Sequence, residues 1–176
     1  MVWGNSKKDF DLIYERTFAL LIRVLVRMMG SAEIAEDICQ ETFVKFHQRT
    51  QGFPSAEEAK FWLLRVAKNL ALNYEKRKTR ERKAYKKVLS DGEGRSTESG
   101  EDEYFKKETS LRVREALLLL PGKLREVLVL KEYGDLSYKE IAAILKISEG
   151  NVKVRVFRAR EWLAAFFQNS EEMHVP

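Results

Sequence analysis

The chain has 176 residues, a net charge of +5 and 44% hydrophobic residues, which is enough for one domain or two small ones. Its one cysteine, Cys39, excludes an internal disulfide and fits a reducing cytoplasm, and we expect this thiol to be buried and inert rather than a redox sensor. The two histidines show no metal-ligand spacing, and there is no glycine-rich phosphate loop or G-x-S-x-G elbow, so we predict no metal, no cofactor and no enzymatic activity.

Hydrophobic periodicity predicts two helices in the first third of the chain, at residues 9–29 and 32–49, separated by Gly30. Arg23 and Arg27 interrupt the apolar run of the first helix, which argues against a signal peptide or a membrane span. The second helix carries acids in its first turns. They either stabilise the positive end of the helix dipole or form a docking face for a basic helix, and the sequence favours neither.

A third, long helix is predicted at residues 56–86, begun by a capping box of Ser55 and Glu58. Cations and amides alternate along one of its faces, at Arg65, Asn69, Asn73, Lys76, Arg77 and Arg80. Cations neutralise phosphates, and amides both donate and accept, which suits the edge of an unpaired base. Three aromatic rings on which such a base could stack lie at the start of this helix, in Phe53, Phe61 and Trp62. Rings of this kind are more often buried in a core. This helix therefore predicts contact with single-stranded DNA.

Residues 89–104 are rich in glycine, serine and acids and almost devoid of apolar side chains, which is typical of a flexible linker. They separate a helical domain at residues 7–88 from a second one at 105–170. We expect an all-α fold of two small domains, each with its own small core.

The second domain contains predicted helices at residues 111–120 and 124–133, followed by a helix-turn-helix. Ser137 and Glu140 form a capping box before its first helix, and Ser148 is placed to cap the second. The second helix has one apolar face, and the opposite face suits phosphates and base edges in a major groove, with Lys153, Val154, Phe157 and Arg158. The alternative is an ordinary helical hairpin with a solvated basic face.

Three segments resemble the extracytoplasmic-function (ECF) sigma factors of bacteria. They are Ala-Glu-Asp-Ile-Cys-Gln-Glu-Thr-Phe at 35–43, Phe-Trp-Leu-Leu-Arg-Val-Ala-Lys-Asn at 61–69, and the helix-turn-helix at 136–162 with its Phe-Arg-Ala-Arg. The resemblance covers nearly the whole chain, in order. It implies a subunit that binds core RNA polymerase and promoter DNA, under the control of an anti-sigma factor.

The resemblance also implies roles for individual residues. The first domain is similar to sigma region 2, whose contacts with the polymerase fall on Glu36, Asp37, Gln40 and Glu41. Its contacts with the melted minus-ten strand fall on Phe53, Trp62, Arg65, Lys68, Asn69, Asn73 and Arg77. Of these, Phe53 and Asn69 stand where the family holds a flipped base. The second domain is similar to region 4, whose minus-thirty-five contacts fall on Lys153, Val154, Phe157 and Arg158. The acidic linker is similar to the segment that follows the RNA-exit path.

Three positions depart from that family's pattern. Asn73 stands where many relatives have aspartate, and Val154 replaces a small polar residue, which favours apolar contact such as a thymine methyl. Lys146 stands where the turn often has glycine; a left-handed backbone there costs on the order of 1 kcal/mol.

Two other functions fit parts of the sequence. A stand-alone regulator would use the helix-turn-helix alone and bind duplex DNA without polymerase. A basic helical RNA-binding or scaffolding protein would make the capped helix-turn-helix incidental.

Overall fold

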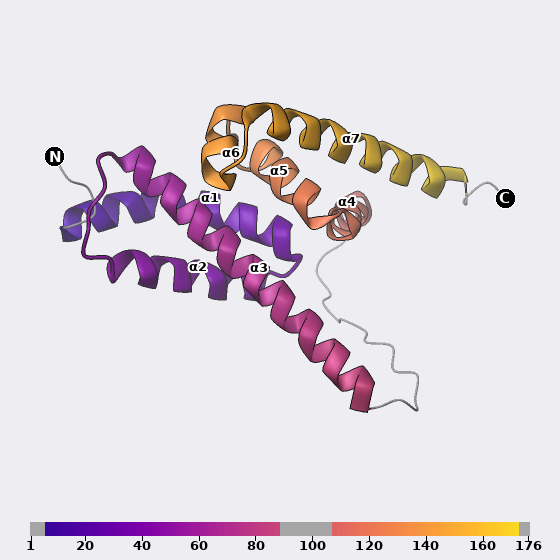
Figure 1. Cartoon of the computed structure of the whole chain (residues 1–176), viewed down its shortest axis with the longest axis horizontal. Helices are drawn as coiled ribbons and strands as arrows, with labels where there is room; N and C mark the ends of the chain where they lie inside the picture. The colour runs from indigo at the N-terminus through magenta and orange to yellow at the C-terminus, as the bar shows by residue number, and fades with distance from the viewer. Residues whose placement is uncertain (1–5, 89–106, 173–176) are drawn as a thin grey trace.

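The computed structural model describes residues 6–88 and 107–172, and every regular element within them is an α-helix (Figure 1). In chain order the helices are α1 (Lys7–Met29), α2 (Ala32–His47), α3 (Ala56–Val88), α4 (Lys107–Leu119), α5 (Gly122–Glu132), α6 (Tyr138–Leu145) and α7 (Glu149–Glu172). This arrangement confirms the predicted all-α fold with a C-terminal helix-turn-helix. In the described ranges, no helix is long and apolar enough to cross a bilayer.

Ser55 and Ser148 cap α3 and α7 as predicted from the sequence, and Ser31 caps α2. Ser31, Ser55 and Ser148 each accept a hydrogen bond from the backbone N–H three residues later, at 3.4, 3.1 and 3.2 Å. At α6 the box is complete: the N–H of Glu140 donates to Ser137 Oγ (3.3 Å), and the N–H of Ser137 donates to Glu140 Oε2 (2.6 Å). Hydrogen bonds that the hydroxyl and the backbone N–H of Ser137 donate to the carboxylate hold the pKa of Glu140 below its usual value. Their contribution to stability is therefore present at neutral pH and is lost as the pH falls through that pKa.

The turn between α6 and α7 holds Lys146 in the left-handed conformation, with φ 56° and ψ 48°. Because glycine lacks the Cβ that opposes this conformation, Lys146→Gly should raise the free energy of unfolding by about 1 kcal/mol. Ala143→Gly, at an exposed position inside α6, should lower it by about the same amount. Urea denaturation of the two variants checks the pair, and a loss of stability in both would contradict the strain at Lys146.

The first of two cores lies between α1, α2 and α3 and is rich in aromatic side chains. It consists of Ile13, Leu21, Leu25, Ala35, Ile38, Cys39, Phe43, Phe46, Phe53, Ala59, Leu63, Ala67 and Ala71. Cys39 is fully buried, and this burial raises the pKa of its thiol to about 11. The thiol is therefore protonated at neutral pH, and the predicted burial of Cys39 is confirmed.

The second core joins the two predicted domains. Val24 and Met28 of α1 and Leu64 of α3 pack in one cluster with the buried side chains of α4 to α7. Figure 1 shows α5 and α6 beside α1 and the first half of α3; α5 contacts α1, and α6 contacts α3. The first domain has a core of its own, as expected, whereas the core of the second domain also includes side chains of α1 and α3, because these two helices each bury a second apolar face against the C-terminal helices.

Several helix boundaries differ from the prediction, most of them by one or two residues, and α4 begins four residues earlier than predicted. The second helix, α2, ends at His47, two residues earlier than predicted. The last helix, α7, continues to Glu172, because after Gly150 no glycine or proline interrupts it. The predicted linker at residues 89–104 and the last four residues lie outside the described residues.

Candidate nucleic-acid interface

The second helix of the helix-turn-helix has one buried and one open face. Val152, Val156 and Ala159 are buried, and α7 packs against α5 and α6. The other face is exposed and carries all four predicted duplex contacts, Lys153, Val154, Phe157 and Arg158. Phe157 is 62% exposed and Val154 is 48% exposed. Apolar side chains in such positions add nothing to this core, and they suit contact with apolar groups in a DNA groove.

The charged residues of α7 divide into two kinds. Lys153 Nζ lies 3.1 Å from Glu149 in an exposed ion pair, which water screens and a phosphate readily replaces. Arg158 has no ion pair or hydrogen bond within the described ranges. By contrast, Arg160 donates to Glu132 Oε1 (2.7 Å) and ties α7 to α5. Of the two arginines, Arg158 is thus the one that is free to contact a ligand.

The predicted strand contacts on α3 differ in exposure. Asn69, Asn73 and Arg77 are exposed. Those nearer the start of the helix are half-buried, namely Trp62, Arg65 and Lys68. The three exposed side chains can contact a DNA strand directly, whereas the three half-buried side chains already pack against other parts of the chain.

A groove of about 700 Å³ runs between α2 and α3. Its walls bring Asp37 and Glu41 of α2 next to Asn73 and Arg77 of α3. Two residues predicted to bind the polymerase therefore border the same groove as two residues predicted to bind DNA. Arg77 also lies 3.7 Å from Glu81 in an exposed ion pair.

Phe53 does not present its ring to solvent. The ring is 6% exposed and packs against Phe46 and Trp62, with 5.7 Å between centroids in each case. The guanidinium carbon of Arg49 lies 4.6 Å from the centroid of Phe53 and 5.4 Å from that of Trp62. In this structure the aromatic surface predicted to hold an unpaired base is covered by a cation.

Arg65 reaches across to the helix-turn-helix. Its terminal amino group donates to the carbonyl of Ala143 (2.8 Å), and its Nε donates to that of Ile144 (3.3 Å). These carbonyls belong to the last turn of α6, where no helical N–H reaches them and a cation suits the helix dipole. Lys60 and Glu140 add an ion pair at 3.8 Å between the same two helices. A residue predicted to contact DNA thus joins the two domains.

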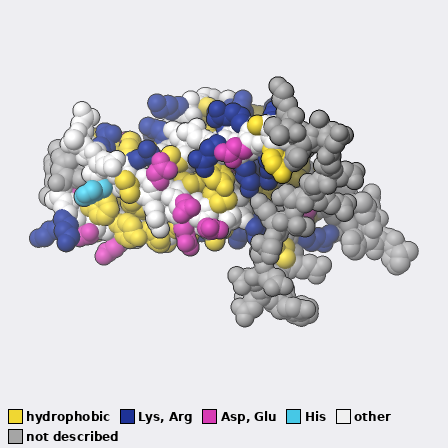
Figure 2. Space-filling model, turned by 90° about the horizontal axis from the view of Figure 1, so that it is seen from below, with side chains coloured by type: hydrophobic (Ala, Val, Ile, Leu, Met, Phe, Trp, Pro, Cys, Tyr) yellow, Lys and Arg dark blue, Asp and Glu magenta, His cyan; other side chains and the backbone are white. Residues whose placement is uncertain are grey.

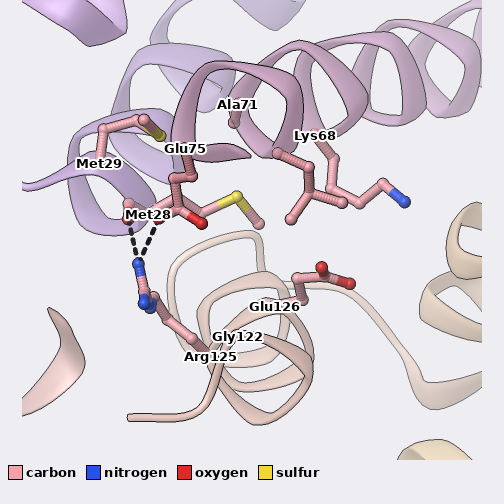
Figure 3. A pocket seen from close by; sticks show the side chains of 9 residues that line it. Met28, Met29, Lys68, Ala71, Glu75, Gly122, Arg125 and Glu126 are labelled. Carbon is pink, nitrogen blue, oxygen red and sulfur yellow. Dashed lines mark hydrogen bonds and ion pairs between the residues drawn. The ribbon is translucent and has the colours of Figure 1, made fainter. Parts of the chain in front are cut away.

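Arg125 of α5 bridges both domains through its guanidinium group (Figure 3). One terminal nitrogen donates to the carbonyl of Met28 (3.0 Å) and to Glu75 Oε1 (2.7 Å). The other donates to the carbonyls of Leu118 (3.1 Å) and Leu120 (3.4 Å). The side chain is only 13% exposed. Arg125 therefore fastens the end of α1 and the middle of α3 to the end of α4.

A small pocket of about 20 Å³ lies beside this arginine, and Figure 3 shows Lys68, Glu75 and Glu126 around it. It is too small for an organic ligand. Burial raises the pKa of Glu126, while the nearby charges of Lys68 and Arg155 act in the opposite direction. The pocket is thus a packing feature of the contact between the domains.

The predicted polymerase contacts lie on an open face of α2. Glu36, Asp37, Gln40 and Glu41 are all exposed. Tyr14, Phe18 and Val44 are exposed on the same pair of helices, α1 and α2. Figure 2 shows hydrophobic side chains beside acidic ones on the face seen from below. An acidic surface with apolar neighbours suits a basic amphipathic partner helix.

Three residues that shape these contacts carry no predicted role, namely Arg49, Glu75 and Arg125. Glu75 and Arg125 lie 50 residues apart, and no local pattern pairs them. The position of Arg49 could have been predicted from the sequence. It lies four residues before Phe53 in a short loop, so its side chain is within reach of the Phe53 ring.

Two family descriptions match the chain in order. Residues 13–81 match the model of sigma-70 region 2, and residues 110–163 match that of sigma-70 region 4. The chain is 30% identical over 167 residues to the RNA polymerase sigma-H factor of Pseudomonas aeruginosa, covering 91% of this chain and 86% of that protein. It is 32% identical over 155 residues to the ECF RNA polymerase sigma factor SigW of Bacillus subtilis, covering 81% and 80%.

Two solved structures share the fold. The sigma factor RpoE of Bartonella quintana, in complex with the anti-sigma factor NepR, aligns with a TM-score of 0.66 and 24% identity over 92% of this chain and 98% of that one. CnrH, in complex with the cytosolic domain of CnrY, aligns with a TM-score of 0.64 and 23% identity over 94% and 92%.

Proposed function

The chain belongs to the extracytoplasmic-function sigma factors, and we propose that it binds core RNA polymerase and directs it to promoters that it contacts at two places. The observation that carries this function is the open face of α7 in a capped helix-turn-helix, on the same chain as the cation and amide face of α3. The protein contributes binding and strand separation in the cytoplasm, and covalent chemistry is left to the polymerase.

The C-terminal domain, residues 105–170, reads duplex DNA through α7. Exposed Lys153 and Arg158 neutralise phosphates or donate to base edges, and exposed Val154 and Phe157 contact thymine methyls. In this reading Arg160 holds α7 in place through Glu132 and is not a contact residue.

Arg158→Ala should cost roughly 1–3 kcal/mol of discrimination at the upstream promoter element, because Arg158 is exposed and has no competing partner within the described ranges. Binding of the full chain with core polymerase to matched and scrambled duplexes measures this discrimination. An equal loss on both duplexes would show that Arg158 contacts only phosphate.

The N-terminal domain, residues 7–88, has two tasks. The acidic face of α2 with Glu36, Asp37, Gln40 and Glu41 binds a basic helical part of the polymerase. The face of α3 with Asn69, Asn73 and Arg77 holds the separated strand. The groove between these helices supports the assignment, since Asp37 and Glu41 line it together with Asn73 and Arg77.

The closed arrangement of the two domains bears on this function. Arg65 donates to the last carbonyls of α6, so it cannot bind a strand phosphate with the same N–H groups. Contact of Arg65 with the minus-ten strand therefore requires α6 to move away from α3. An anti-sigma factor that binds the closed form would keep Arg65 engaged; the similar RpoE structure was solved in complex with the anti-sigma factor NepR.

Run-off transcription with purified core polymerase on a pool of genomic promoters tests the function. We expect discrete transcripts that depend on this chain. Tight, specific duplex binding by the chain alone, without transcription, would instead indicate a stand-alone regulator.

A further inference from the structure

The loop between α2 and α3 places a cation where an unpaired base was expected. Arg49 covers the rings of Phe53 and Trp62, at 4.6 and 5.4 Å from their centroids. Its Nε donates to the carbonyl of Gln51 (2.7 Å), which fixes the guanidinium over these rings. The Phe53 ring itself is 6% exposed. A base that approaches this site therefore meets Arg49 before it meets Phe53.

The guanidinium of Arg49 is equipped to take over that contact. A guanidinium plane that rests on an aromatic ring presents its outer face as a stacking surface for a base. Within the described residues, its terminal amino groups have no hydrogen-bond partner, and they are available to base edges or phosphates. Phe53, Trp62 and the Gln51 carbonyl then act as its support.

An open groove of about 680 Å³ borders the same arginine. It is lined by Ser6, Lys7, Phe10, Asp11, His47, Arg49 and Thr50. Three of these side chains are basic, Lys7, His47 and Arg49, and one is acidic, Asp11. Phe10 lies edge-on to His47, with 5.5 Å between the ring centroids. Basic side chains beside aromatic rings are the typical lining of a channel for a single strand.

We propose that Arg49 contacts an unpaired base of the promoter strand directly and that the groove beside it receives the adjoining sugar-phosphate. This inference rests on the proposed function, because it assigns a further residue to the strand contact of region 2. It changes the role of Phe53 from a stacking surface to the support of one, and it adds Lys7 and His47 as phosphate contacts.

The test combines variants of Arg49 with abasic sites in the strand. The full chain with core polymerase is bound to a promoter fragment from the run-off experiment, pre-melted over the minus-ten region, with one base at a time removed. For the wild type, one abasic position should weaken binding about tenfold, the size of a single stacking contact. For Arg49→Ala, binding to the intact strand should already be weaker by that factor, and the same abasic position should cost nothing more.

Arg49→Lys keeps the positive charge but lacks the planar guanidinium group. Its binding should therefore keep the salt dependence of the wild type, but the abasic site should no longer weaken it. Gln51→Ala is the matched control, because it keeps the carbonyl that holds Arg49 and should behave as the wild type. An abasic penalty that is unchanged in Arg49→Ala at every position would overturn the proposal. An equal loss of binding affinity by Arg49→Ala on every probe would also overturn it, because a purely structural role of Arg49 gives that result. Failure of the proposed function is distinct, since the wild type would then yield no transcripts.

Discussion

Arg125→Ala should separate the two domains of the free chain. Arg125 joins Met28 and Glu75 of the first domain to Leu118 and Leu120 of the second with four hydrogen bonds. Its removal leaves the three carbonyls without this donor and the carboxylate of Glu75 without its cation, at a cost in stability. Because Glu75 remains 38% exposed, water offsets part of that cost, and we expect a loss of about 2–3 kcal/mol.

Small-angle scattering and urea denaturation of the full chain measure this effect. We expect a larger radius of gyration and a transition in which the C-terminal helices unfold before α1 to α3. Arg114→Ala, an exposed arginine of α4, is the matched control and should leave both measurements unchanged. A compact Arg125→Ala chain with wild-type stability would contradict the role given to this arginine.

Arg65→Ala should loosen the closed form and also impair promoter opening. In the free chain it removes two hydrogen bonds from a cation to the end of α6, and hydrogen bonds to charged groups contribute about 1.5–3 kcal/mol. In the complex with polymerase it removes a cation from the strand-contact face of α3. Permanganate footprinting of the open complex measures the second effect.

Glu75→Gln separates the two roles of Arg65. It weakens the ion pair with Arg125 and so loosens the closed form, but it leaves Arg65 intact. We expect Glu75→Gln to open promoters at least as well as the wild type, whereas Arg65→Ala opens them several-fold less. Equal behaviour of the two variants would mean that Arg65 acts only between the domains.

Local structure was predictable because its causes are local. Ser137 and Glu140 lie three residues apart, and each satisfies a backbone N–H of the other, so the sequence pattern already contains the contact. The exposed face of α7 follows in the same way from the spacing of Val152, Val156 and Ala159. The helices and the helix-turn-helix were therefore correct to within a few residues, apart from the end of α7.

The contact between the domains was not predictable in this way. Arg23 donates to the carbonyl of Tyr133 (2.7 Å) across 110 residues, and Arg65 reaches Ala143 across 78. Periodicity shows that a face of α1 is apolar, but not which helix covers it. For the same reason Arg65 was assigned to DNA alone, although its partner in the free chain is α6.

The distance between the two domains tests the central claim most directly. Dyes on cysteines introduced at Arg16 of α1 and Glu161 of α7, both exposed, report this distance by energy transfer, and buried Cys39 is replaced by serine. We predict efficient transfer in the free chain and a marked loss of transfer on binding core polymerase and a promoter. Unchanged transfer in a complex that produces transcripts would contradict the account.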